Sequence, residues 1–387
     1  MKPVFARTLR HPVINWIYAL LLLATPFMPT PSARADSSVP RLETLIVSGD
    51  ESWRYPAPAA SSRIIVIGDI HGDLGALYRI LSDRGLVDIR GHWIGGANQL
   101  VLLGDLNDRG NDTRYIIEYV RRLEREAQLQ SGKVHTLMGN HDLMILRGDF
   151  RYTAPNELSA YEGFRAHRRL RITGPPQLTA NGAPRRLSSL EADYWAALAM
   201  EHGRWMISRP CVIQIGPYVF SHGGIQRELF DFPGHVSSFN ATVRAWALYL
   251  TAPYSNPRPP QSTLWVFTAH QANPTWDHKL ALGKSDPKDV EFILRTLNAT
   301  HIFVGHTLSV RTRDRYDGAV RLMDSGNSYA YQSGEGHLTS AEIKNNQITT
   351  QTHQRPPRLH TLWQAYRLDL IDEQPSCSIF LESSASL

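Results

Sequence analysis

Short apolar runs in this chain stop repeatedly at small groups of Asp, Asn and His residues. The run Arg-Ile-Ile-Val-Ile at 63–67 is typical of a strand buried on both faces, as in a parallel sheet covered by helices. In open sheets of this kind, sites form outside the carboxyl ends of the strands. Five polar segments follow in order along the chain, at 68–73, 104–110, 139–142, 222–224 and 305–307. Their recurrence predicts one site that is assembled from distant parts of the sequence.

The chain between these segments alternates between strand and helix patterns. The predicted elements of this first part are strands at 63–68, 99–104 and 133–138 and helices at about 73–84 and 112–129. Asp73 stands where a helix cap is expected. The alternation predicts a parallel sheet covered by helices. Residues 143–209 break the rhythm and look largely helical, so we expect an insertion over the edge of the sheet or over the site.

The second part of the chain continues with shorter strands. The predicted elements are strands at 211–215, 217–221, 300–304, 319–323 and 337–350 and a helix at about 287–297. We therefore expect a loop segment at 36–62, one domain at 63–354 and a C-terminal extension at 355–387.

The N-terminus has the pattern of a secretory signal peptide. Lys2, Arg7 and Arg10 precede an apolar stretch at about 13–27, and small residues stand at 33 and 35. The alternative is an uncleaved anchor, but the stretch is short for a span of roughly 20 residues. We expect cleavage of residues 1–35, export, and no stable membrane insertion afterwards. A bacterial periplasm is the expected destination, and a eukaryotic secretory route stays open.

Charge and cysteine content exclude some classes of protein. Removing residues 1–35 takes away four of the 41 Lys and Arg and none of the 36 Asp and Glu, which lowers the formal net charge from +5 to +1. A nearly neutral mature chain gives no indication of a nucleic-acid partner. Two cysteines, Cys211 and Cys377, do not make a disulfide scaffold, and whether they pair is left open.

The residue types in the five polar segments suit a pair of metal ions. Asp69 and His71 lie two apart on a glycine-flanked turn, and the carboxylate of Asp105 has two oxygens with which to bridge two ions. The remaining candidate ligands are Asn140, His222 and His306. Mixed nitrogen and oxygen ligands suit manganese, iron or zinc better than calcium or magnesium. Two ions roughly 3.5–4 Å apart can polarise a phosphoryl group and neutralise its developing charge.

These segments resemble those of the calcineurin-like metallophosphoesterases. Gly-Asp-x-x-Asp-Arg-Gly at 104–110 resembles the phosphoprotein-phosphatase group. Gly-Asn-His-Asp-Leu-Met at 139–144 and Gly-Asp-Phe-Arg-Tyr at 148–152 are most similar to its bacterial branch, the Shewanella-like phosphatases. The resemblance covers about 63–326 and implies an α/β fold, the αββα sandwich of this superfamily, with a helical insertion.

The resemblance also implies roles for the matching positions. It assigns Asp69, His71 and Asp105 to the first metal, and Asp105, Asn140, His222 and His306 to the second. His141 resembles the general acid, with Asp108 orienting its imidazole. Arg109 would bind the substrate phosphate, and Asp324 resembles a residue that fixes a ligand histidine from outside the coordination shell. The implied reaction is in-line attack by a metal-bound hydroxide, without a phospho-enzyme.

Some positions depart from the family pattern. Asp142 stands where Glu is usual, Asn107 where an apolar residue is usual, and no second phosphate-binding arginine is identifiable. The function we expect is hydrolysis of phosphate monoesters, with phosphorylated protein or peptide as the leading substrate class. One alternative is a hydrolase of dinucleoside polyphosphates or other small phosphoesters. The other is an inactive, metal-bound binding module.

Overall fold

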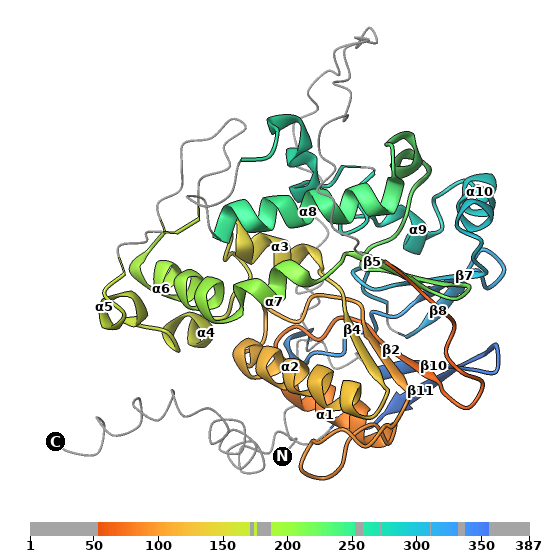
Figure 1. Ribbon diagram of the computed structural model, residues 1–387, viewed down its shortest axis with the longest axis horizontal. Coiled ribbons are helices and arrows are strands. Elements are labelled where there is room, and N and C mark those ends of the chain that lie inside the picture. Colours follow the sequence, from red (N-terminus) through yellow and green to blue (C-terminus); the bar gives the residue numbers. More distant parts are fainter. Residues whose placement is uncertain are drawn as a thin grey trace, which may run out of the picture. The chain divides into compact units, whose positions relative to one another are not determined.

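A computed structural model describes the part of the chain that carries the five polar segments (Figure 1). The described residues are 53–170, 174–175, 187–251, 258–270, 272–309, 311–331 and 337–355. The predicted signal peptide, Cys377 and nearly all of the predicted C-terminal extension lie outside them. Cys211 is a buried free thiol. No helix in these ranges is long and apolar enough to cross a membrane.

One sheet has five strands in the order β11-β10-β2-β3-β4. Its members are β2 (Ile64–Ile67), β3 (Gln99–Leu102), β4 (Lys133–Thr136), β10 (Leu338–Lys344) and β11 (Gln347–His353). β2, β3 and β4 are parallel, whereas β10 runs antiparallel to β2 and to β11. The prediction of a single strand at 337–350 was wrong, because two strands, β10 and β11, lie there. Asn345 and Asn346, with φ of 51° and 60°, turn the chain there into a hairpin.

The other sheet has six strands in the order β1-β5-β6-β7-β9-β8. Its members are β1 (Arg54–Tyr55), β5 (Val212–Ile215), β6 (Tyr218–Ser221), β7 (His301–Val304), β8 (Arg313–Arg315) and β9 (Val320–Leu322). β6, β7 and β9 are parallel neighbours, so their carboxyl ends point the same way. The two shortest edge strands, β1 and β8, were not predicted from the sequence.

Helices cover the outer face of each sheet. In Figure 1, α1 (Leu74–Asp83) and α2 (Thr113–Leu129) lie below β4, and α8 (His235–Thr251) lies above β5. The first two share an apolar cluster with β2 and β3, and α8 and α10 (Pro287–Leu297) share another with β5 to β7. A third cluster, which includes Val66, Phe220 and Phe303, fills the space between the sheets.

This arrangement is the four-layer αββα sandwich, and the predicted fold class is confirmed. Residues of β2 alternate between the helix-facing cluster and the inter-sheet cluster, which explains why the whole strand is apolar. The side chain of Asp73 accepts the N–H of Ala76, so the predicted cap of α1 is also confirmed.

The described part of the region between β4 and β5 is largely helical, with turns between the helices. It contains α3 (Asn140–Leu146), α4 (Pro155–Ser159), α5 (Phe164–His167), α6 (Ser189–Ala197), the π-helix η1 (Leu198–His202) and α7 (Gly203–Ser208). Its aromatic side chains, among them Phe150, Tyr161 and Tyr194, form an apolar cluster of their own. Short helical turns elsewhere are η2 (Arg227–Asp231), η3 (Gln261–Phe267), α9 (Lys279–Leu282) and η4 (Tyr329–Tyr331).

Candidate active site

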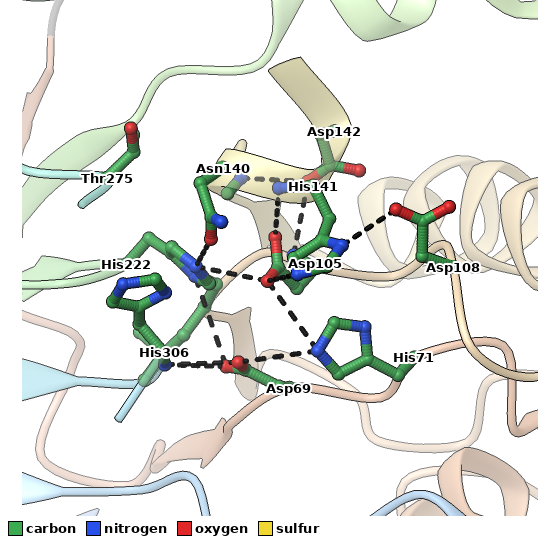
Figure 2. A network of polar contacts seen from close by, with 12 residues as sticks. Asp69, His71, Asp105, Asp108, Asn140, His141, Asp142, His222, Thr275 and His306 are labelled. Atoms are coloured by element: carbon green, nitrogen blue, oxygen red, sulfur yellow. Dashed lines mark hydrogen bonds and ion pairs between the residues drawn. The ribbon is translucent and has the colours of Figure 1, made fainter. Parts of the chain in front are cut away.

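The predicted site residues follow the carboxyl ends of six strands. They are Asp69 and His71 after β2, Asp105 after β3, Asn140 and His141 after β4, His222 after β6, His306 after β7 and Asp324 after β9. Three of these strands belong to each sheet. Figure 2 shows these side chains, apart from Asp324, converging on one small region, although they come from positions up to 237 residues apart.

Several of these residues have a left-handed backbone that non-glycine residues rarely adopt. The φ angle is 43° at His71, 49° at Asp105 and 62° at His306, and it is 66° and 65° at Asp108 and Arg109. Such conformations cost on the order of 1–3 kcal/mol each and persist where the surroundings hold them. The turns hold each other here, since the N–H of His71 donates to the carbonyl of Asp105 at 2.9 Å.

Glycines allow these turns to pack closely. A Cβ atom at Gly110 would overlap the carbonyl group of Gly72, and one at Gly139 would overlap the carboxylate of Asp105. The glycines of the motifs are therefore required by contacts between one turn and the next. Without these contacts the ligand side chains could not converge.

Asp105 lies at the centre of the site and is buried. Its Oδ2 is 3.3 Å from Nε2 of His222 and 3.6 Å from Nε2 of His71 (Figure 2). Nε2 of His71 is also 3.9 Å from Oδ2 of Asp69, whose oxygens accept the backbone N–H of His306 at 3.1 Å. Two groups of side chains have ligand atoms within 4.8 Å of one another: His71, Asp105 and His141, and Asp105, His222 and His306. Asp105 is the member they share.

Backbone carbonyls fix the orientation of two of the histidines. Nδ1 of His71 lies 2.9 Å from the carbonyl oxygen of Asn107, and Nδ1 of His222 lies 2.9 Å from that of Leu103. A ring nitrogen next to a carbonyl carries the proton and donates it, which leaves the lone pair on Nε2. This is the arrangement that metal-binding histidines usually have. In both residues Nε2 is the atom that faces Asp105.

The contact between His222 and Asn140 requires a proton or a metal ion at Nε2 of His222. Nε2 of His222 lies 2.9 Å from Oδ1 of Asn140, and neither atom would carry a proton in a neutral imidazole whose Nδ1 donates to Leu103. Burial would lower the pKa of His222, but Asp105 and Asp69 raise it to about 10. Only an added proton or a metal ion relieves such a contact. Two ligand atoms of one ion, each about 2.0–2.2 Å from it, lie roughly 3 Å apart. The distance between Nε2 of His222 and Oδ1 of Asn140 is close to this value.

The carboxylates of the site point to the same need. Burial and the nearby Asp324 raise the pKa of Asp69 well above its ordinary value. Burial also raises the pKa of Asp324, to about 6. Burial would raise the pKa of Asp105 as well, but His222 and His141 hold it well below the ordinary value. Carboxylates beside imidazoles are a donor set that divalent cations complete, so these residues fit the binding of metal ions.

His141 and Asp108 form a buried pair beside this set. Nδ1 of His141 is 2.7 Å from Oδ2 of Asp108, and Nε2 of His141 faces Asp105 at 4.0 Å (Figure 2). The other oxygen of Asp108 accepts the hydroxyl of Thr153 at 2.6 Å. Sequence reasoning did not identify Thr153. An imidazole with a carboxylate on Nδ1 can hold a proton on Nε2, and the same geometry also allows it to bind a metal.

Arg109 lies between two tyrosine rings at the mouth of the site. Its guanidinium carbon is 5.1 Å from the ring centre of Tyr152 and 5.0 Å from that of Tyr331. Its Nε is buried and has no hydrogen-bond partner among the described residues. Tyr152 is 43% exposed, so the surroundings of Arg109 open towards solvent. A guanidinium beside two tyrosine rings, with a donor that has no partner among the described residues, suits an oxyanion such as phosphate.

The structure adds two residues that no motif indicated. Arg209 forms a buried ion pair of 3.3 Å with Asp142, whose Oδ2 accepts the N–H of Asp105 at 3.1 Å. His278 stacks on His306 with ring centres 4.2 Å apart and their Nε2 atoms 3.1 Å apart. His278 thus contacts a predicted ligand directly, whereas Arg209 supports Asp105 through Asp142.

Asp324 does not have the contact that the sequence suggested. Its Oδ1 accepts the N–H of Gly326 at 3.1 Å, and its Oδ2 has no hydrogen-bond partner among the described residues. The carbonyls of Leu103 and Asn107 orient His222 and His71 in its place. The role predicted for Asp324, fixing a ligand histidine, has no hydrogen bond to support it.

Comparisons with known proteins agree with this geometry. Shewanella-like protein phosphatase 2 of Arabidopsis thaliana is 30% identical over 202 residues, which cover 48% of this chain and 51% of that protein. Shewanella-like protein phosphatase 1 of Plasmodium berghei is 28% identical over 215 residues, covering 54% and 53%. The chain thus spans about half the length of these two relatives. The predicted resemblance to Shewanella-like phosphatases is confirmed.

A solved structure has a similar fold. The crystal structure of a cold-active protein-tyrosine phosphatase from a psychrophilic Shewanella species superposes with a TM-score of 0.57 at 24% identity, covering 78% of this chain and 82% of that one. The family model for calcineurin-like phosphoesterases matches residues 62–310, which include all five polar segments. The chain is therefore a member of the calcineurin-like phosphoesterase family.

Proposed function

We propose that the chain is an exported phosphatase that uses two metal ions to hydrolyse phosphate monoesters, with phosphorylated protein or peptide as the leading substrate. The observation that carries the proposal is the position of Asp105, whose carboxylate lies between two sets of nitrogen and oxygen donors. A single buried carboxylate shared by two ligand sets is what a two-ion site requires. Both named relatives with aligned sequences are described as protein phosphatases.

The proposed ligands divide into two sets. The first is Asp69, His71 and Asp105, and the second is Asp105, Asn140, His222 and His306. The mixture of carboxylate, amide and imidazole donors favours manganese, iron or zinc. When bound, two such ions would polarise the phosphoryl group and activate a water molecule for attack on phosphorus.

The remaining groups would act on the substrate. Arg109 would bind the phosphate oxygens, with the rings of Tyr152 and Tyr331 packed against its guanidinium group. His141 would donate a proton from Nε2 to the leaving oxygen, and Asp108 would hold the ring through Nδ1. General acid catalysis of this kind contributes typically 10²–10⁴-fold.

A general acid and a metal ligand at His141 would differ in the effect of a His141→Asn substitution. If His141 is the acid, His141→Asn keeps both ions but hydrolyses substrates with poor leaving groups much more slowly. If it is a ligand, the same variant loses an ion. Measuring metal content together with turnover separates the two roles.

Export is proposed from the sequence alone. The basic residues before the apolar stretch at about 13–27 and the small residues at 33 and 35 support cleavage before Asp36. Fractionation of cells that express the full chain tests this part of the proposal. Recovery of the protein in the periplasm or medium, with Asp36 as its first residue, is the expected result.

Phosphate release tests the activity. Residues 36–387 would be stripped of metal, reloaded with manganese, iron or zinc, and offered an aryl phosphate, phosphopeptides and a dinucleoside polyphosphate. We expect metal-dependent release of phosphate that disappears in Asp105→Asn and persists in Asp317→Asn, the same change at an exposed turn. Nucleotide release from the dinucleoside polyphosphate alone would favour an anhydride substrate. If the chain binds two ions but releases neither phosphate nor nucleotide, the inactive binding module becomes the favoured alternative.

A further inference from the structure

The segment before α4 runs against the turn that carries the proposed acid pair. The carbonyl of Tyr152 accepts the backbone N–H of Arg109 at 2.8 Å. One residue later, the hydroxyl of Thr153 donates to Oδ1 of Asp108 at 2.6 Å. Two adjacent residues of this segment thus hold two adjacent residues of the turn.

The hydroxyl completes a line of three buried groups. Asp108 uses Oδ1 for Thr153 and Oδ2 for Nδ1 of His141, the latter at 2.7 Å. Asp108 is fully buried, and Thr153 and His141 are 9% and 4% exposed. A buried carboxylate whose two oxygens both have a partner keeps its plane fixed.

Asp108 needs this support because its own backbone does not provide it. Its φ of 66° and that of Arg109, 65°, lie in the left-handed region, outside any helix or strand. The terminal torsion of an Asp side chain is also broad, so the carboxylate can rotate unless its oxygens are held. Rotation of Asp108 would move the atom that holds the imidazole of His141.

We propose that Thr153 is a positioning residue for proton donation by His141, acting through Asp108. This inference rests on the proposed function. Thr153 does not touch the substrate; it keeps the carboxylate plane of Asp108 aligned with Nδ1 of His141. The effect of losing the hydroxyl should therefore depend on how much the leaving group needs a proton.

Two variants and two substrates test the proposal on the metal-loaded mature chain. Thr153→Val removes the hydroxyl with nearly the same volume, and Thr153→Ser keeps it. The first substrate is 2,4-dinitrophenyl phosphate, whose phenolate can leave without a proton. The second is phenyl phosphate, whose leaving oxygen needs a proton. Thr136→Val is the matched control, because the hydroxyl of Thr136 also donates to a carboxylate, that of Glu124, at 3.2 Å but outside this line of groups.

We expect Thr153→Val to lower kcat for phenyl phosphate about tenfold, a fraction of what a general acid contributes. It should change kcat for the dinitrophenyl ester less than about twofold, and Thr153→Ser and Thr136→Val should behave like the parent chain on both esters. In an Asp108→Asn background, Thr153→Val should cause no further loss.

Three results would overturn the inference. The first is an equal loss of kcat on both esters in Thr153→Val, which indicates a purely structural role. The second is an unchanged kcat of Thr153→Val on phenyl phosphate. The third is a Thr153→Ser variant that is as impaired as Thr153→Val. Failure of the proposed function has a different signature. In that case the parent chain itself, with its metals bound, would release no phosphate from either ester.

Discussion

Glu157 makes the stability of this protein depend on pH in a window that the structure defines. It lies in α4, is 2% exposed, and its Oε2 accepts the N–H of Thr113 at the start of α2 at 3.1 Å. Burial outweighs this hydrogen bond and raises the pKa of Glu157 from 4.5 to about 8. The folded chain therefore keeps a proton that the unfolded chain releases.

The sign and size of the effect follow from linkage. Between pH 4.5 and about 8 the unfolded chain binds fewer protons at this position than the folded one, so stability falls as the pH rises. At about 1.4 kcal/mol per pH unit, the full gap corresponds to about 5 kcal/mol. Structural relaxation and water entry reduce such penalties, so we expect about 2–4 kcal/mol between pH 5 and pH 9.

Glu157→Gln removes the ionisable group and keeps an oxygen that can accept the N–H of Thr113. Urea unfolding of both proteins, with saturating metal, at pH 5, 7 and 9 measures the effect. The variant should gain about 2–4 kcal/mol over the parent chain as the pH rises, because the other titrating groups cancel in the difference. Glu291→Gln, at a side chain that is 73% exposed, should show no such gain. Parallel pH profiles for the parent chain and Glu157→Gln would refute the reasoning.

Three further predictions concern the surroundings of the site. Gly110→Ala should prevent folding or lower the urea midpoint strongly, because the added methyl group overlaps the facing glycine backbone. Arg209→Met should cost about 3–5 kcal/mol in urea unfolding, because it leaves Asp142 as an unpaired buried charge. His278→Phe should lose one of two bound ions roughly 10–100-fold more readily to a chelator, measured by elemental analysis, because His306 loses the imidazole that faces its Nε2. Normal folding of Gly110→Ala would contradict the first prediction, and an unchanged urea midpoint of Arg209→Met would contradict the second. Unchanged metal retention in His278→Phe would contradict the third.

Much of the core could be predicted because its signals are local. β2 is apolar throughout since it is buried on both faces, and the cap of α1 is the residue next to the helix. The clustering of the proposed ligands could be predicted because each of these residues follows the end of a strand. α8 was missed although Phe239, Val243, Trp246 and Leu250 recur at helical spacing, so its signal was present.

The supporting residues could not be predicted, because their contacts join distant parts of the chain. Thr153 meets Asp108 across 45 residues, and His278 meets His306 across 28. Neither Thr153 nor His278 has a spacing that distinguishes it from an ordinary polar residue. The hairpin at Asn345 was missed because its turn contains no glycine or proline.

One buried carboxylate, that of Asp105, is proposed to join two metal ions. Loading the mature chain with manganese, counting the ions by elemental analysis and recording the electron paramagnetic resonance spectrum tests this without relying on activity. We predict two manganese ions per chain with a spin-coupled spectrum, as expected for ions roughly 3.5–4 Å apart, and loss of the coupling in Asp105→Asn. One ion per chain, or two ions with an uncoupled spectrum in the parent protein, would contradict the account.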